Sequence, residues 1–179
     1  MRPDDESEFA GLVERQWRFA YRVAWAMLRN AHDAEDAAQE TFLKVFQARA
    51  WRGIRDERAF VARVAWRAAM DRLRGLAVRA GAPSAQHSAD EALAAVADAG
   101  RDPEQEAIAA NETAALHRLI DSLPEELRQP LALSTEMNSR EIAEAMGIAE
   151  GTVRTRLMRA RAMLREKITA MEERRYAQR

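Results

Sequence analysis

Residues 138–167 read NSREIAEAMGIAEGTVRTRLMRARAMLREK. Asn138 and Glu141 have the spacing of a capping box, and Met137 and Ile142 occupy the two positions of a hydrophobic staple. Gly147 predicts a left-handed helix end. A second helix is predicted from Glu150, because apolar residues then recur at helical spacing: Val153, Leu157, Ala160, Leu164 and Ile168. Two helices around a glycine-bearing turn predict a helix-turn-helix.

The second of these helices is strongly basic. Residues 151–167 contain six basic residues and one acid. Recognition helices contact base edges with residues of their N-terminal half, and arginine pairs well with guanine. An ordinary solvated basic helix is the simpler alternative. The capped partner helix just before it favours DNA recognition.

Composition limits the classes of function. The chain has 179 residues, of which 47% are hydrophobic and 32% charged, and no cysteine. We therefore expect a reducing compartment and no thiolate metal site. No apolar run approaches the roughly 18 residues of a membrane span, and the polar N-terminus is unlike a signal peptide, so we expect a cytoplasmic protein. Scattered glycines and histidines predict no catalytic site, metal, cofactor or small-molecule substrate.

Charge is unevenly distributed along the chain. The net charge of −1 argues against non-specific coating of DNA. Residues 49–79 contain nine bases and three acids, whereas residues 80–110 contain six acids and one base. The bases are nearly all arginine, which suits phosphate or base contacts, although a GC-rich coding bias explains the arginines equally well.

The N-terminal part predicts three helices. Residues 8–29 form an amphipathic pattern that ends at Asn30, and Asp33 is the expected cap of the next helix. Acids near that helix start are expected from the helix dipole, but Glu40 lies two turns further on. After a loop at 47–57, a third helix is predicted over residues 58–74.

The third helix carries arginines on one face. Arg63, Arg67 and Arg74 share that face, next to Trp66. Aromatic residues between arginines suit an unstacked nucleic-acid strand, and packing of Trp66 on a neighbouring helix is an equally good interpretation. Asp71 and Arg74 are spaced for a local ion pair.

Between the two halves lies an alanine-rich, acidic segment with few large apolar residues, which predicts a linker. No segment alternates as a strand does. The sequence therefore predicts an all-α protein of two small helical bundles, with domains at residues 1–78 and 105–179 and a flexible linker at 79–104.

With these residues in view, the chain resembles the extracytoplasmic-function type of bacterial RNA polymerase sigma factor. Four segments carry the resemblance: DAEDAAQETF at 33–42, RAFVARVAWRAAMDRLR at 58–74, LPEELR at 123–128 and GTVRTRLMRARAML at 151–164. The first two are similar to sigma region 2, and the last two to region 4. Their order and separation match the family.

The resemblance implies a role for each cluster of residues. Core polymerase would be bound by Asp33, Asp36, Gln39, Glu40, Phe42 and Leu43. The −10 promoter element would be contacted by Trp51, Arg52, Arg55, Arg58, Arg63, Trp66, Arg67 and Arg74. The −35 element would be contacted by Thr152, Arg154, Thr155, Arg156, Met158, Arg159 and Arg161. The implied partners are core RNA polymerase (the clamp of the largest subunit and the flap of the second), promoter DNA and an anti-sigma factor.

Some positions depart from the family pattern. Arg67 stands where relatives often have Asn, so the −10 preference does not carry over. Asn138 replaces a Ser cap with an equivalent one, and Ala149 lacks the usual cap of the recognition helix, a loss of roughly 0.5–2 kcal/mol that Glu150 partly offsets. A free-standing helix-turn-helix regulator is the alternative, but it leaves the acidic helix at 33–42 unexplained. A helical adaptor leaves the arginine-rich helix unexplained.

Overall fold

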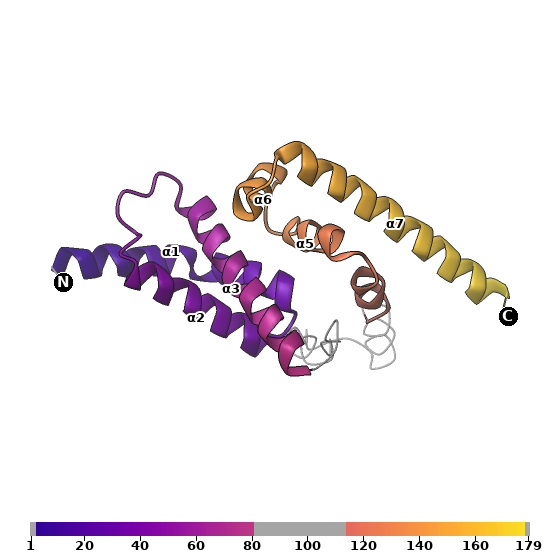
Figure 1. Cartoon of the computed structure of the whole chain (residues 1–179), viewed down its shortest axis with the longest axis horizontal. Helices are drawn as coiled ribbons and strands as arrows, with labels where there is room; N and C mark the ends of the chain where they lie inside the picture. Colours follow the sequence, from indigo (N-terminus) through magenta and orange to yellow (C-terminus); the bar gives the residue numbers. More distant parts are fainter. Residues whose placement is uncertain (1–2, 81–113, 178–179) are drawn as a thin grey trace, which may run out of the picture.

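The computed structural model describes residues 3–80 and 114–177, and within these ranges it contains helices and turns but no strand (Figure 1). The all-α prediction is therefore confirmed. Residues 114–121 are helical, and the other helices are α1 (Pro3–Leu28), α2 (Ala31–Gln47), α3 (Glu57–Ala80), α5 (Glu125–Leu133), α6 (Ser139–Met146) and α7 (Glu150–Ala177). None of the described helices is long and apolar enough to cross a membrane.

The first bundle consists of α1, α2 and α3, each of which packs on the other two. Its centre is formed by large apolar side chains such as Val23, Val45 and Val61, which are at most 2% exposed. At one end of the bundle, the rings of Phe9 and Phe46 pack on Trp51 with centroids 5.2 and 5.6 Å away. These aromatic contacts fix the loop between α2 and α3 to the bundle.

The junction of α1 and α2 differs from the predicted one. α1 ends at Leu28, and Arg29 takes a left-handed conformation (φ 51°) with its N–H donating to the carbonyl of Trp25 at 2.8 Å. Asn30 caps α2, because its side-chain oxygen accepts from the N–H of Asp33 at 2.9 Å. The prediction that Asp33 is the cap was wrong. Asn30 stands three residues ahead of Asp33, as an N-cap stands ahead of the N–H that it satisfies.

The second bundle consists of α5, α6 and α7, and its turns follow the predicted pattern. Asn138 accepts from the N–H groups of Arg140 and Glu141, and Glu141 in return accepts from the N–H of Asn138 at 2.8 Å. Gly147 ends α6 in the left-handed conformation, with φ 69°. The predicted capping box and glycine stop are confirmed.

Replacing Asn138 with alanine is expected to lower the free energy of unfolding by about 1 kcal/mol, because the first N–H groups of α6 lose their acceptor. Urea denaturation followed by circular dichroism measures the loss. Asn138→Ser is the matched control and should lie within a few tenths of a kcal/mol of the native protein. Equal losses for both variants would contradict the capping role.

The two bundles pack on each other in this structure. α3 lies against α6, and α1 lies against α5 (Figure 1). One cluster of buried apolar side chains continues across the contact, from Phe19 and Val61 in the first bundle to Leu133, Met137 and Ile142 in the second. The sequence indicated two bundles but no contact between them. The predicted domain limit at residue 78 falls within α3, and the predicted linker lies largely outside the described residues.

Candidate nucleic-acid and protein interfaces

The first turns of α7 present a surface suited to contact DNA. Val153, Leu157 and Ala160 are buried against the rest of the bundle. Thr155 and Arg159 are exposed on the opposite side, and Met158 beside them is 62% exposed. The hydroxyl of Thr155 donates to the carbonyl of Gly151 at 2.9 Å, so its methyl group is the part offered to a partner.

The seven residues implied in −35 contact all lie on this helix. Six are exposed, and Arg156 is half-buried. Arg154 forms an ion pair with Glu150 one turn earlier, which holds its guanidinium near the start of the helix. The structure therefore brings the whole predicted set together, and it leaves the surface around Thr155 and Arg159 uncovered by any described residue.

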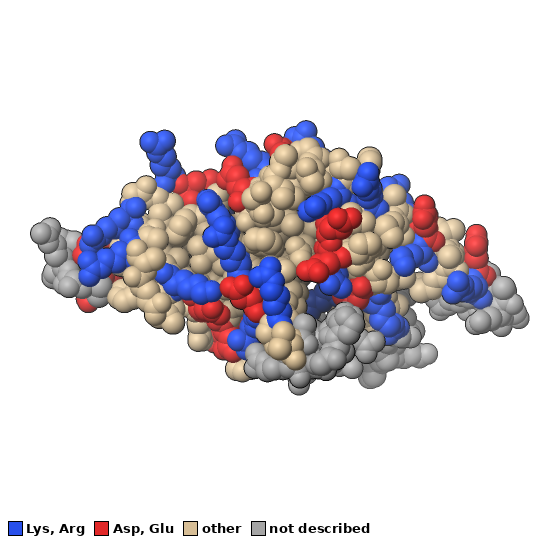
Figure 2. All heavy atoms as spheres, in the orientation of Figure 1, with Lys and Arg blue, Asp and Glu red and all other residues tan. Residues whose placement is uncertain are grey.

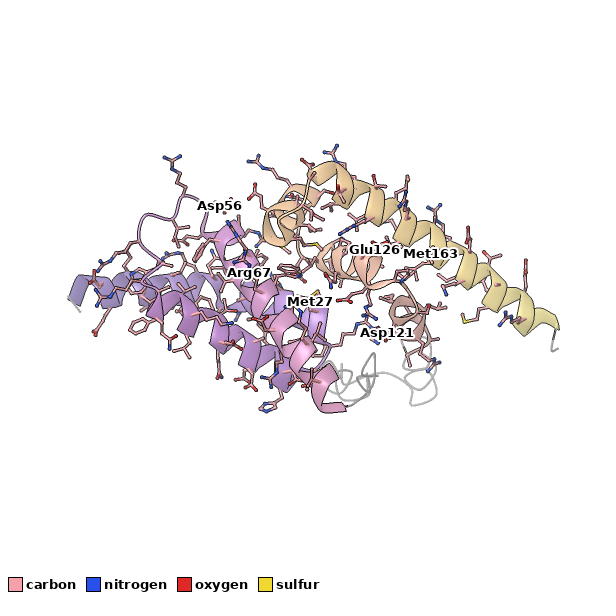
Figure 3. The ribbon with its side chains drawn as sticks, in the orientation of Figure 1. Met27, Asp56, Arg67, Asp121, Glu126 and Met163 are labelled. Carbon is pink, nitrogen blue, oxygen red and sulfur yellow. The ribbon has the colours of Figure 1, made fainter. Side chains whose placement is uncertain are left out.

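The arginines of α3 form a second exposed basic surface. Arg63, Arg67 and Arg74 are all exposed, and Arg67 is labelled on α3 in Figure 3. The predicted pair of Asp71 and Arg74 is confirmed at 3.2 Å. Trp66 is half-buried and packs against the apolar cluster, which supports the packing interpretation of this side chain.

The loop before α3 contains a correction to the predicted −10 set. Trp51 is only 5% exposed and is stacked on Phe46, so its ring belongs to the core and not to the surface. Arg52 forms an ion pair with Asp5 of α1. Arg55 is exposed. The apolar residues around Trp51 do not recur at helix or strand spacing, so the sequence could not indicate whether the ring is packed or exposed.

The acidic helix α2 divides into an internal part and an exposed part. Arg72 of α3 donates to Asp33 at 2.7 Å and to Asp36 at 2.6 Å. Phe42 is buried, with its ring 5.8 Å from that of Trp17. Three of the residues implied in polymerase docking therefore have structural contacts within the bundle.

The other three residues implied in polymerase docking lie on the exposed part of α2. Gln39 is exposed, and Leu43 is 54% exposed. Glu40 lies beside them and pairs with Lys44 at 2.8 Å, and Lys44 also reaches Asp71 at 3.5 Å. An exposed leucine next to paired charges is the kind of surface that a protein partner buries.

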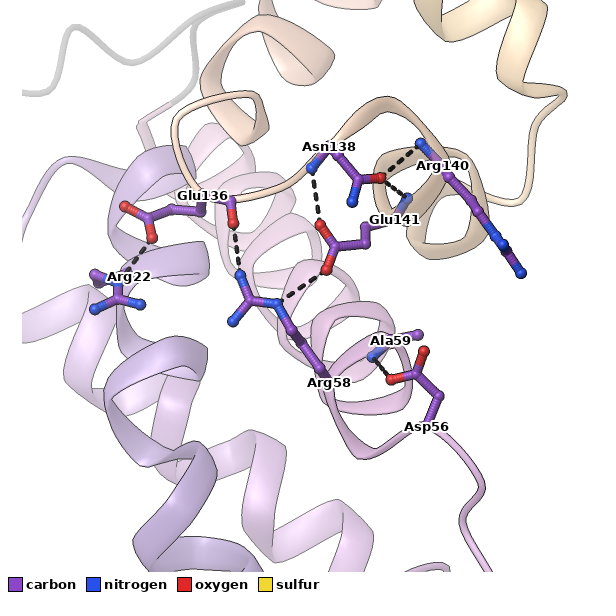
Figure 4. Close-up of polar contacts among 8 residues, drawn as sticks. All are labelled: Arg22, Asp56, Arg58, Ala59, Glu136, Asn138, Arg140 and Glu141. Carbon is purple, nitrogen blue, oxygen red and sulfur yellow. Dashed lines mark hydrogen bonds and ion pairs between the residues drawn. The ribbon is translucent and has the colours of Figure 1, made fainter.

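Arg58, at the start of α3, has partners in the other bundle (Figure 4). Its guanidinium donates to the carboxylate of Glu141 at 2.9 Å and to the carbonyl of Glu136 at 2.8 Å. Arg22 of α1 donates to the carboxylate of Glu136 at 2.7 Å. Sequence reasoning missed these contacts and those of Arg72, because their partners are 36 to 114 residues away along the chain.

A half-open cavity of about 360 Å³ follows the same contact, lined by residues of both bundles that include Trp25, Arg29 and His117. Arg29 pairs with Asp121 at 3.1 Å. Burial lowers the pKa of His117, and the positive charge of Arg29 lowers it further. Both effects favour the neutral form of His117.

Charges elsewhere are mixed. On the face drawn in Figure 2, basic side chains project over both bundles, with acidic groups between them. Among the residues that the structure describes, no group of three histidine or acidic side chains is placed to hold a metal ion.

Comparison with known proteins identifies both halves of the chain. Residues 12–78 match the Sigma-70 region 2 family, and residues 113–164 match Sigma-70, region 4. The chain is 32% identical over 165 residues to the ECF RNA polymerase sigma factor SigM of Mycobacterium tuberculosis, covering 89% of this chain and 76% of SigM. It is 28% identical over 174 residues to the ECF sigma factor SigW of Bacillus subtilis, covering 92% of this chain and 90% of SigW.

The chain does not span every relative to the same extent. It is 30% identical over 151 residues to the probable RNA polymerase sigma factor RfaY of Xanthomonas campestris, covering 82% of this chain but only 36% of that protein. The whole of RfaY is therefore much longer than the matched part.

Two solved structures share the fold. One is CnrH in complex with the cytosolic domain of CnrY, with a TM-score of 0.59 and 21% identity over 90% of this chain and 88% of that one. The other is the sigma factor RpoE in complex with the anti-sigma factor NepR from Bartonella quintana, with a TM-score of 0.60 and 17% identity over 90% and 96% of the two chains. This likeness concerns the fold alone. The two region matches and the relative SigM lead to one conclusion: the chain belongs to the sigma-70 family of RNA polymerase sigma factors, in its extracytoplasmic-function group.

Proposed function

We propose that the protein binds core RNA polymerase and directs transcription initiation at promoters with a −10 and a −35 element. The observation that carries the proposal is the presence of two exposed arginine surfaces, on α3 within region 2 and on α7 within region 4. A single recognition helix serves many regulators, whereas two surfaces in these two regions suit one promoter contacted at two points. The protein would act in the cytoplasm and have no catalytic activity of its own.

The two surfaces suit different forms of DNA. The exposed threonine, methionine and arginine of α7 fit the major groove of duplex DNA, where arginine pairs with guanine and a methyl or thioether group contacts thymine. The surface of α3 offers Arg63 and Arg67 beside the half-buried Trp66, which suits the backbone of an opened strand at the −10 element. Capture of an unstacked base there costs a few kcal/mol, which binding to polymerase would offset.

Docking to polymerase is assigned to the exposed edge of α2, with Gln39, Glu40 and Leu43 in direct contact. Asp33 and Asp36 would act indirectly, since Arg72 holds both carboxylates. Both similar structures are complexes: CnrH with the cytosolic domain of CnrY, and RpoE with the anti-sigma factor NepR. We infer that this chain also has an anti-sigma partner.

Reconstituted transcription tests the proposal. The protein is expected to direct initiation at specific sites when added to core polymerase, and to bind the same promoters weakly by itself. Run-off transcription on a fragmented library of genomic DNA, followed by mapping of the start sites, identifies the promoters. Strong specific binding to duplex DNA without polymerase, with no stimulation of transcription, would favour the free-standing regulator instead.

A further inference from the structure

Arg58 connects the two bundles at their polar contact. The family resemblance places Arg58 in the −10 surface, yet its guanidinium is directed to the second bundle (Figure 4). It donates to Glu141 at 2.9 Å and to the carbonyl of Glu136 at 2.8 Å, and its central carbon lies 3.8 Å from the centre of the Phe19 ring. The Nε–H and one terminal amino group of this guanidinium are therefore occupied by the second bundle, and the Phe19 ring packs against it.

Charge and apolar packing both favour the closed contact. In each of three ion pairs that cross it, the arginine belongs to the first bundle and the acid to the second half of the chain: Arg22 with Glu136, Arg29 with Asp121 and Arg58 with Glu141. The apolar cluster that continues across the contact is buried on both sides, since its residues Phe19, Val61, Leu133, Met137 and Ile142 are at most 6% exposed. The two surfaces are therefore complementary in charge and in apolar character.

We propose that the free protein holds its second bundle closed on its first, and that α6 competes with promoter DNA for Arg58. A carboxylate and a phosphate use the same donors of a guanidinium, so Glu141 of α6 occupies the place that the −10 strand would take. The recognition surface of α7 remains exposed in this closed form. Closure therefore withholds Arg58 from the −10 strand, while Arg63, Arg67 and Arg74 of α3 and the surface of α7 stay accessible.

The apparent affinity for a −10 strand then depends on the fraction of open molecules, because only the open form binds through Arg58. The Arg58–Glu141 pair is partly exposed, with side-chain exposures of 42% and 23%, so its removal is expected to have a modest effect. Loss of such an ion pair is expected to raise the ratio of open to closed molecules about two- to fivefold.

Glu141 permits a clean test because its two oxygens have different tasks. One accepts from Arg58, and the other accepts from the N–H of Asn138 in the capping box. Glutamine also serves at this position of a capping box, so Glu141→Gln removes the charge and keeps the cap. Glu144 lies on the same helix and pairs with Arg140 at 3.2 Å, and Glu144→Gln is the matched control for the loss of one negative charge.

Single-molecule energy transfer on the whole chain measures closure without polymerase. The sequence contains no cysteine, so Ala48→Cys and Ala162→Cys, both at exposed positions, attach one dye to each bundle. The native protein is expected to be mainly compact. Glu141→Gln should raise the ratio of extended to compact molecules about two- to fivefold, and Glu144→Gln should leave it unchanged. A labelled random single strand of about 20 nucleotides should bind Glu141→Gln tighter by the same factor.

A native protein that is mainly extended, or equal effects of the two glutamine variants on distance and on strand binding, would overturn the proposal. The strand-binding measurement rests on the proposed function, but the distance measurement does not. A compact protein that responds to Glu141→Gln but fails to direct transcription with core polymerase would refute the proposed function and leave the closed form standing.

Discussion

The variant Glu40→Lys is expected to bind core polymerase at least about 30-fold more weakly than the native protein, the effect of losing a central contact of a protein interface. Glu40 lies on the exposed edge of α2, next to Leu43, and its side chain is 41% exposed. A partner surface that accepts this acidic edge carries positive charge, and a lysine there places like charges in contact. Within α2 the change removes the ion pair with Lys44 and places two positive charges one turn apart, which together cost less than about 1 kcal/mol.

Equilibrium binding of labelled protein to purified core polymerase measures the loss, and circular dichroism verifies that the helices remain. Glu14→Lys is the matched control, since Glu14 is an exposed acid on α1 and its replacement changes the charge by the same amount. Native affinity in Glu40→Lys, or an equal loss in Glu14→Lys, would show that the edge of α2 is not the docking surface. Asp36→Lys would be a poorer test, because it also disrupts the contact with Arg72.

The features that were predictable from the sequence are those whose partners are near in the chain. The capping box joins Asn138 to Glu141 across three residues, and the Asp71–Arg74 pair has the same separation. The apolar stripes of α2 and α7 likewise follow from helical spacing alone. Even here the cap of α2 was predicted wrongly, because Asn30 and Asp33 are both of residue types that cap helices well and only the backbone distinguishes them.

Contacts between distant segments were not predictable. Asp33 and Asp36 lie within the segment that matches sigma region 2, and nothing in their spacing indicates that Arg72 pairs with both. In the sequence nothing distinguishes Arg58 from other basic residues at the start of a helix, because its partners are 78 and 83 residues away. A residue's type and helical face indicate which chemistry it offers. Whether that chemistry is available to a partner depends on packing between distant segments, and such packing produces no periodic pattern in the sequence.

The variant Arg159→Ala is expected to lower transcription from a promoter of this protein by about 5- to 100-fold, with binding to polymerase unchanged. Arg159 is exposed on the outer face of α7, and none of the hydrogen bonds or ion pairs within the described residues engages its guanidinium. It is therefore available to a base edge without breaking an internal contact. Its removal leaves the buried face of α7, and hence the fold of the second bundle, intact.

Arg165→Ala is the matched control, because it removes the same charge from an exposed position of α7 beyond the turns that enter a groove. Transcription from promoters with each −35 base pair varied in turn separates the two effects. If Arg159 contacts a base, transcription by Arg159→Ala should become insensitive to substitution at one or two base pairs of the −35 element. If Arg159 contacts a phosphate, the variant should lower transcription from all promoters alike, and the slope of promoter binding against salt concentration should fall by about one ion. Equal, uniform losses in both variants would place Arg159 on the backbone of the DNA. Glu40→Lys is expected to act on polymerase binding and Arg159→Ala on promoter choice. Identical behaviour of these two variants in both assays would therefore refute the division of roles between α2 and α7.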